Sequence, residues 1–352
     1  MRKVLLTTTA LIALGGISAA TADVNISGKL IQRYNQWSDD DAAAAGANNS
    51  SMTKDLQLWI QSSATLDNGM TVGGNIRLRG EAVGTPDDRN YVVVGGDFGS
   101  ITWGSTWAPI YSNSVGFNWM DDINQGGEYE GGSVGGTATT DDGASRSRVF
   151  TDSYTSTSGK AQKVIYSTPS INGFKLSASF ADAGATSEGD HTSIAAVYNN
   201  GPIKVYYATE DADHANSTST TEDTELREYG VQFSGDFGRV WALAKSDKNT
   251  TVAGSEVSNQ EGSQVGVTYN LADNLTGVAY YTTSEENATA SANTNDEYSA
   301  TALGVDYAVG GGLHMSVMHT MFDYTDATNS TATAGQGSND GAATRIQMTL
   351  KF

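Results

Sequence analysis

The sequence predicts an all-β fold, a 16-stranded antiparallel transmembrane β-barrel with one very long loop. Three observations predict the barrel: short segments in which apolar and polar residues alternate, connections that alternate between short and long, and no sustained helical period in residues 23–352. An alternation with a period of two is typical of a strand that has one apolar and one polar face.

The last segment has the sharpest alternation, because Ile346, Met348, Leu350 and Phe352 share one parity and polar residues occupy the other. In the first segment, Ile31 is the exception to the pattern. Segments 239–247 and 275–284 carry apolar residues on both faces, so their facing stays open. The candidate strands lie near residues 23–37, 53–66, 70–82, 90–97, 100–107, 162–169, 173–182, 191–199, 202–210, 225–235, 239–247, 263–271, 275–284, 297–308, 313–324 and 344–352.

The connections between these segments alternate in length. Short ones are rich in Gly, Asn and Asp, as in Asn200-Gly201, and suit tight hairpins. Long ones are polar and of low complexity, such as 284–296 and 326–341. A strict alternation places all the tight turns at one end of the sheet, which is what an up-and-down antiparallel barrel does.

Two folds fit alternating strands: a soluble sandwich with its apolar face inward, and a membrane barrel with its apolar face outward. The polar parity carries many Arg, Lys, Gln and Asn side chains, which a water-filled lumen can hold. The segments are long enough for a tilted span of about 9–11 residues. Aromatic residues lie near segment ends, as in the girdles of membrane barrels. These features favour the membrane barrel, and a secreted soluble β-sandwich that binds a ligand remains the alternative.

Residues 1–22 have the pattern of a signal peptide. Arg2 and Lys3 form a short positive region, residues 4–17 are mostly apolar, and Ala20-Thr21-Ala22 supplies small residues for cleavage after Ala22. The apolar run is shorter than the roughly 20 residues of a membrane-spanning helix. The sequence therefore predicts an exported chain whose single domain is a barrel over residues 23–352, located in the bacterial outer membrane.

The composition excludes several classes of function. With 20 Lys and Arg against 40 Asp and Glu, the net charge of −20 argues against nucleic acid as a partner. There is no cysteine, so no disulfide holds the chain, and a closed sheet with paired edges is an alternative means of support. No nucleophile elbow or His-Asp pairing indicates an enzyme, and neither the four histidines nor Asp39-Asp40-Asp41 has metal-ligand spacing. We expect no catalytic residue, no metal and no cofactor.

Three stretches resemble the Gram-negative general porins, a family of trimeric, 16-stranded channels. Residues 24–30 are similar to the opening strand of the family, and residues 95–104, which contain Gly96-Asp97-Phe98-Gly99, are similar to the hairpin before its third loop. The terminal strand ends in Phe352, which the resemblance implies is an assembly signal read by the barrel-assembly machinery. The resemblance spans residues 23–352 and implies a homotrimer in outer-membrane lipid that passes small hydrophilic solutes and ions.

The longest connection, residues 108–159, supplies a candidate pore constriction. Connections beyond about 15 residues are uncommon unless they are functional. The resemblance implies that this loop folds into the barrel, where its acids would face the lumen: Asp121, Asp122, Glu128 and Glu130. The opposite wall would carry the bases of the polar parity in the first and third strands: Lys29, Arg33, Arg77 and Arg79.

Acids that face bases across a narrow pore produce a transverse field that sets ion preference. Because acids outnumber bases in the chain, the sequence predicts a general diffusion channel with mild cation selectivity. A channel that prefers one substrate is the alternative function. A solvated external loop, whose acids are ordinary surface charge, is the alternative for residues 108–159.

Overall fold

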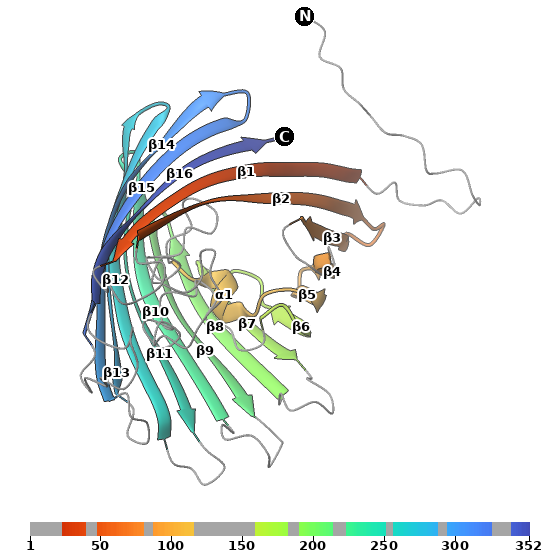
Figure 1. The fold of residues 1–352 in the computed structure, drawn as a ribbon. Helices are drawn as coiled ribbons and strands as arrows, with labels where there is room; N and C mark the ends of the chain where they lie inside the picture. The colour runs from red at the N-terminus through yellow and green to blue at the C-terminus, as the bar shows by residue number, and fades with distance from the viewer. Residues whose placement is uncertain are drawn as a thin grey trace, which may run out of the picture.

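The chain folds into one closed antiparallel barrel in the computed structural model, which describes residues 23–39, 48–80, 87–115, 159–181, 190–213, 223–250, 256–287, 294–325 and 339–352 (Figure 1). Among these residues, no helix is long and apolar enough to cross a membrane. The strands are β1 Asp23–Asp39, β2 Asn48–Thr65, β3 Thr71–Arg79, β4 Asp87–Gly96, β5 Gly99–Ser105, β6 Gln162–Ser167, β7 Phe174–Ala181, β8 Asp190–Asn200, β9 Ile203–Asp213, β10 Asp223–Gly235, β11 Gly238–Thr250, β12 Glu256–Ala272, β13 Leu275–Asn287, β14 Thr294–Gly310, β15 Leu313–Thr325 and β16 Asn339–Lys351.

Every strand pairs with its neighbours in sequence, and β1 also pairs with β16 to close the sheet. The sixteen segments predicted from the alternation are all confirmed, and several strands are longer than predicted. The soluble sandwich is wrong, because a single closed sheet has no second sheet to pack against. Closure also leaves no strand edge unpaired, which answers how a chain without disulfides is held together.

The two faces of the barrel differ in composition as the sequence predicts. Large apolar side chains point outward and are exposed, including Leu30 at 41%, Tyr229 at 57% and Val265 at 52%. The opposite parity points into the lumen and holds buried polar side chains such as Gln264 and Thr282. An apolar outer band with a polar interior is the arrangement of a transmembrane barrel.

The facing that the sequence left open in β11 and β13 is set by the registers. Trp241 pairs with Gly266 on the lumen side, so Val240 points outward and is 40% exposed. In β13, Tyr280 lies buried on the lumen face and Tyr281 points outward. Both faces read as apolar because this part of the lumen wall is itself apolar.

Aromatic rings on this wall lie flat over glycines of the next strand. A Cβ atom added to Gly266 would come within 2.6 Å of ring atoms of Trp241, so only glycine leaves room for the indole. Rings that cover glycines stabilise the glycine position by packing. Two further pairs on the lumen wall have the same geometry: Tyr206 over Gly230, and Phe322 over Gly341.

The two Gly-Asp-Phe-Gly turns end in a glycine for a backbone reason. Gly99 has a φ of 105° and Gly238 a φ of 126°, a region that other residues rarely adopt. A Cβ atom at either position would also overlap a carbonyl oxygen of the neighbouring strand, at Ser167 and Thr268 respectively. The repeated motif is therefore a requirement of these two hairpins.

Candidate functional site

The predicted basic wall lies on the lumen face of β1 and β3, with β2 between them. Lys29 pairs with Gln57, which in turn pairs with Arg79. Arg33 lies further along β1, and Arg77 precedes Arg79 on the same face of β3. The structure thus brings the four bases onto one stretch of the lumen wall, as expected from their parity. Their place at a constriction stays a prediction.

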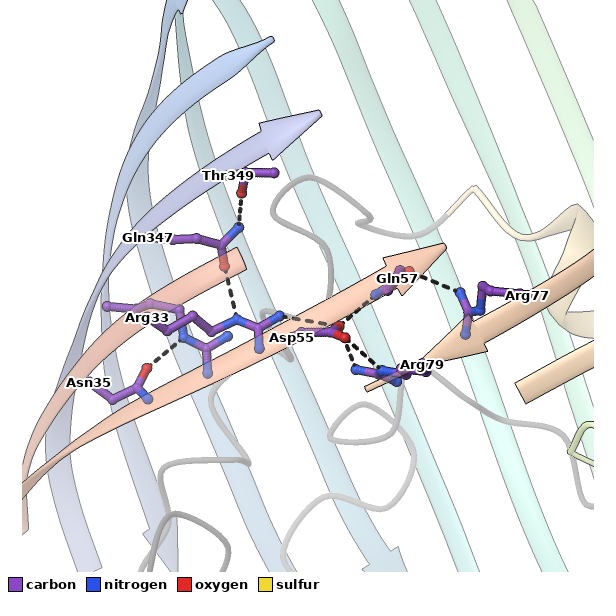
Figure 2. A network of polar contacts seen from close by, with 9 residues as sticks. Arg33, Asn35, Asp55, Gln57, Arg77, Arg79, Gln347 and Thr349 are labelled. Atoms are coloured by element: carbon purple, nitrogen blue, oxygen red, sulfur yellow. Dashed lines mark hydrogen bonds and ion pairs between the residues drawn. The ribbon is translucent and has the colours of Figure 1, made fainter. Parts of the chain in front are cut away.

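A carboxylate at the centre of this wall was not among the predicted site residues. Asp55 of β2 accepts two hydrogen bonds from Arg79, of 3.2 Å from Nε and 2.9 Å from Nη2 (Figure 2). Nη2 of Arg33 lies 4.0 Å from the same carboxylate, and the Gln57 amide donates to it at 2.5 Å. Because Asp55 is only 1% exposed, its charge acts on these arginines with little screening by water.

Neutral side chains orient the other bases. Arg77 Nη1 donates to Gln57 Oε1 at 3.3 Å, and Arg33 Nε donates to Gln347 Oε1 at 3.0 Å. Gln347 itself donates to Thr349 of the same strand (Figure 2). Lys29 Nζ lies 5.6 Å from the centre of the Trp59 ring, within reach of a cation–π interaction. The wall is therefore one connected polar network that spans β16, β1, β2 and β3.

Two more arginines belong to the same region and were also missed. Arg345 of β16 donates to Asn35 of β1 at 2.7 Å, and Arg89 of β4 pairs with Arg77 in the register. The polar parity of the last segment places Arg345 in the lumen. What the sequence could not provide is the register between β16 and β1, which places Arg345 opposite Asn35.

The four predicted loop acids, Asp121, Asp122, Glu128 and Glu130, lie outside the described residues, since the description stops at Val115 and resumes at Gly159. Inward folding of residues 116–158 stays a prediction.

The first part of this connection lies inside the barrel (Figure 1). It contains the short helix α1, Pro109–Asn113, which contacts β7, β8 and β9. The Ile110 amide donates to Ser193 Oγ at 3.2 Å, and Ser114 Oγ lies 3.3 Å from the Tyr206 hydroxyl. Ile110 and Val115 are buried in the apolar cluster of the lumen wall.

Both ends of the connection are held by one lysine. Lys163 Nζ donates to the carbonyl oxygens of Thr106, at 2.5 Å, and of Gly159, at 2.8 Å. Ser105 Oγ adds a bond to the carbonyl of Lys160. A buried ammonium shared by two carbonyls fixes the spacing of the two stems of the loop.

The described lumen face carries more bases than acids. Its acids are Asp23, Asp55, Glu210, Glu228, Asp247 and Asp306. Its bases are Lys29, Arg33, Arg77, Arg79, Arg89, Lys163, Lys175, Lys204, Arg239, Lys245, Arg345 and Lys351. Several acids point outward instead, such as Glu261, Glu285 and Glu297, which neighbour one another in β12, β13 and β14. Within the described ranges, no group of three or more His, Asp or Glu is placed to hold a metal ion.

A closed barrel with an apolar outer band and a charged, polar lumen defines the class of outer-membrane β-barrel channels. The sequence supports this class directly, because the family model for Gram-negative porins matches residues 7–330. The chain belongs to the Gram-negative porin family and forms a channel of the outer membrane. The family and the fold both indicate a channel rather than an enzyme.

Solved structures of low sequence identity share this fold. The anion-selective porin from Comamonas acidovorans is 14% identical with a TM-score of 0.70, over 94% of this chain and 100% of that one. The outer membrane channel DcaP of Acinetobacter baumannii is 14% identical with a TM-score of 0.67, over 97% and 100%. The in-vitro folded OmpT of Vibrio cholerae, in its trimer form, is 11% identical with a TM-score of 0.66, over 94% and 99%. No curated protein matches the sequence.

Proposed function

We propose that the protein is a general diffusion porin, a water-filled channel for small hydrophilic solutes and ions. The observation that carries this proposal is the composition of the lumen face. Charged and amide side chains line the wall that β16, β1, β2 and β3 form. A polar lining of this kind keeps an aqueous path open through the barrel. A channel that binds one substrate would need a further set of convergent groups.

We further propose that the channel prefers anions, which revises the expectation of mild cation selectivity. That expectation was drawn from the charge of the whole chain, whereas permeating ions respond to the charges that line their path. Bases prevail over acids on the described lumen face, and much of the acidic excess lies on the outward face or outside the described residues. The Comamonas porin is anion-selective, and its fold is similar to that of this chain.

Planar bilayer recording tests both proposals. Purified protein should give stepwise openings, and in a salt gradient the reversal potential should favour chloride over potassium. Absence of any channel would overturn the porin function, whereas a reversal potential that favours potassium would overturn only the anion preference.

The loop acids provide a second arm of this experiment. If residues 116–158 fold inward, amide variants of the loop acids should move the reversal potential further toward anions: Asp121→Asn, Asp122→Asn, Glu128→Gln and Glu130→Gln. An external solvated loop predicts no change, since charges beyond a Debye length of about 8–10 Å are largely screened.

We propose a homotrimer as the assembly, supported by small and polar residues on the outward face of β2, β3 and β4. Ser62 pairs with Gly74, and Asn90 pairs with Ile76, in a band that should otherwise be apolar. They line a depression of about 490 Å³ beside Trp103, which is 69% exposed. A second copy is a better neighbour for such a surface than lipid. Bilayer openings in groups of three, and a trimer mass in detergent, are the expected results.

A further inference from the structure

The lumen contains a second cationic site, separate from the basic wall, on β9 and β11. Lys204 begins this site two residues after the turn at Gly201-Pro202, and Arg239 follows the turn at Asp236-Phe237. Both side chains have lumen parity, because Lys204 pairs with Gln232 and Arg239 pairs with Ser234 of the strand between them. Short turns lie at the periplasmic end of outer-membrane barrels. The pair therefore lies toward the periplasmic side of the lumen.

The surroundings of the pair hold the two cations without neutralising them. Lys204 Nζ donates to the Ser114 carbonyl at 3.2 Å and lies 6.0 Å from the centre of the Tyr206 ring. The Arg239 guanidinium lies 5.0 Å from the centre of the Trp241 ring and reaches Gln232 Oε1 at 3.5 Å. These contacts are neutral carbonyls and aromatic faces. No carboxylate within the described part of the chain forms an ion pair with either side chain.

Three other lumen cations, Arg33, Arg79 and Lys245, do contact a carboxylate. On the basic wall, Asp55 accepts two hydrogen bonds from Arg79 and lies 4.0 Å from Arg33. On β10 and β11, Glu228 lies 3.0 Å from Lys245 and also accepts a hydrogen bond from Tyr206. Glu228 is the carboxylate whose charge acts on Lys204, and it is already engaged by Lys245 and Tyr206.

The two cations lie on the lumen face of the sheet, one on each side of β10. Gln232 separates them in the sheet, and the charge of Arg239 acts on Lys204. Two like charges held together repel each other, so an anion that binds between them relieves this repulsion. Both side chains are only partly buried, which leaves their donors accessible from the lumen.

We infer that Lys204 and Arg239 form a binding site for the oxyanion group of a permeating solute, a phosphate or a carboxylate. Arg presents a planar fork of donors that matches such groups, and Lys adds a compact charge. Gln232 and Ser234, which are joined by a 3.0 Å hydrogen bond, border the site with further polar atoms. The site gives solutes that carry an oxyanion a favourable binding position toward the periplasmic side of the lumen, separate from the basic wall. This inference rests on the proposed channel function.

The test uses inorganic phosphate as the probe, on purified full-length channels in a planar bilayer at constant chloride. In the unchanged protein, added phosphate should lower the chloride conductance with saturation. In the variant Lys204→Gln/Arg239→Gln, the half-saturating phosphate concentration should rise about tenfold, because both charge-assisted contacts are lost. With acetate in place of phosphate, the half-saturating concentration should again be lower in the unchanged protein than in the double variant. An effect of phosphate without an effect of acetate would indicate a site that accepts phosphate alone.

Three controls make the result specific. The charge-keeping variant Lys204→Arg should stay close to the unchanged protein, and it shows that folding survives substitution at this position. Lys54→Gln removes an exposed outward charge of β2 and should have no effect. Arg77→Gln alters the basic wall and should leave the half-saturating concentration nearly unchanged.

The outcomes separate the inference from the function on which it rests. Conductance without a phosphate effect, or a phosphate effect that is lost in Arg77→Gln but kept in the double variant, overturns the oxyanion site and leaves the porin intact. Absence of conductance in the unchanged protein overturns both.

Discussion

The ring of the C-terminal Phe352 lies over Gly28, and the backbones of these two residues form the seam of the barrel. The Gly28 amide donates to the Phe352 carbonyl at 2.8 Å, and the Phe352 amide donates back to the Gly28 carbonyl at 3.0 Å. A Cβ atom at Gly28 would approach Cζ of the ring to 2.6 Å, which is closer than van der Waals contact. Glycine is therefore required where the last residue closes the sheet.

Substitution of Gly28 should weaken this seam. Gly28→Val forces the Phe352 ring away and should destabilise the folded barrel by about 1–3 kcal/mol, the usual range for overpacking. The measurement is the temperature at which the folded band is lost on semi-native gels. Gly277→Val is the matched control, since a Cβ atom there first meets the flexible end of Leu271 at 3.2 Å. Equal melting of the two variants would contradict the role of the contact.

Removal of the terminal ring should affect assembly. Phe352→Ala exposes Gly28 and removes the aromatic residue that the resemblance marks as an assembly signal, so less protein should reach the outer-membrane fraction. Phe352→Tyr keeps the ring and should restore the yield. If Phe352→Ala accumulates normally, the terminal residue is no signal in this chain.

Loss of the Asp55 carboxylate should change selectivity. In Asp55→Asn, Arg33 and Arg79 lose the negative charge of Asp55, so the reversal potential should move toward anions. Stability should fall because the charge-assisted hydrogen bonds that Asp55 accepts from Arg79 are weakened. Asp323→Asn removes an exposed acid on the outward face and is the control. A shift of the same size in both variants would show that Asp55 has no special effect on permeating ions.

The contact of the Trp241 ring with Gly266 on the lumen wall leads to a prediction about pore size. Gly266→Val should lift the Trp241 ring into the lumen and lower the single-channel conductance. The double variant Gly266→Val/Trp241→Ala should recover conductance, because the displaced ring is gone. Failure of this rescue would indicate that the valine acts through the backbone instead.

Export should remove the predicted signal peptide. Cleavage after Ala22 gives a mature chain that begins at Asp23, the residue at which β1 starts. Intact mass measurement of protein from the outer-membrane fraction checks this directly. A mature chain that keeps residues 1–22 would contradict the prediction.

The strands could be predicted from the sequence because a period of two and turn-forming residues are local signals. The basic wall followed from the parity of Lys29, Arg33, Arg77 and Arg79 alone. Asp55 was missed as a site residue because its contact with Arg79 depends on the register between β2 and β3.

Selectivity was harder to predict for a different reason. The net charge of the chain does not report where charges lie, and here Glu261, Glu285 and Glu297 point away from the lumen. The apolar lumen wall at Trp241 was ambiguous because the buried cluster to which Trp241 belongs includes residues of a distant segment, such as Ile110.

The pairing of β1 with β16 joins strands from the two ends of residues 23–352. Such a contact forms only after β16 has been synthesised, and distant pairings are slow to form. Until then the sheet has two open edges that can recruit other chains. A chain that lacks β16 would keep those edges, so closure of the sheet and resistance to aggregation depend on the same strand.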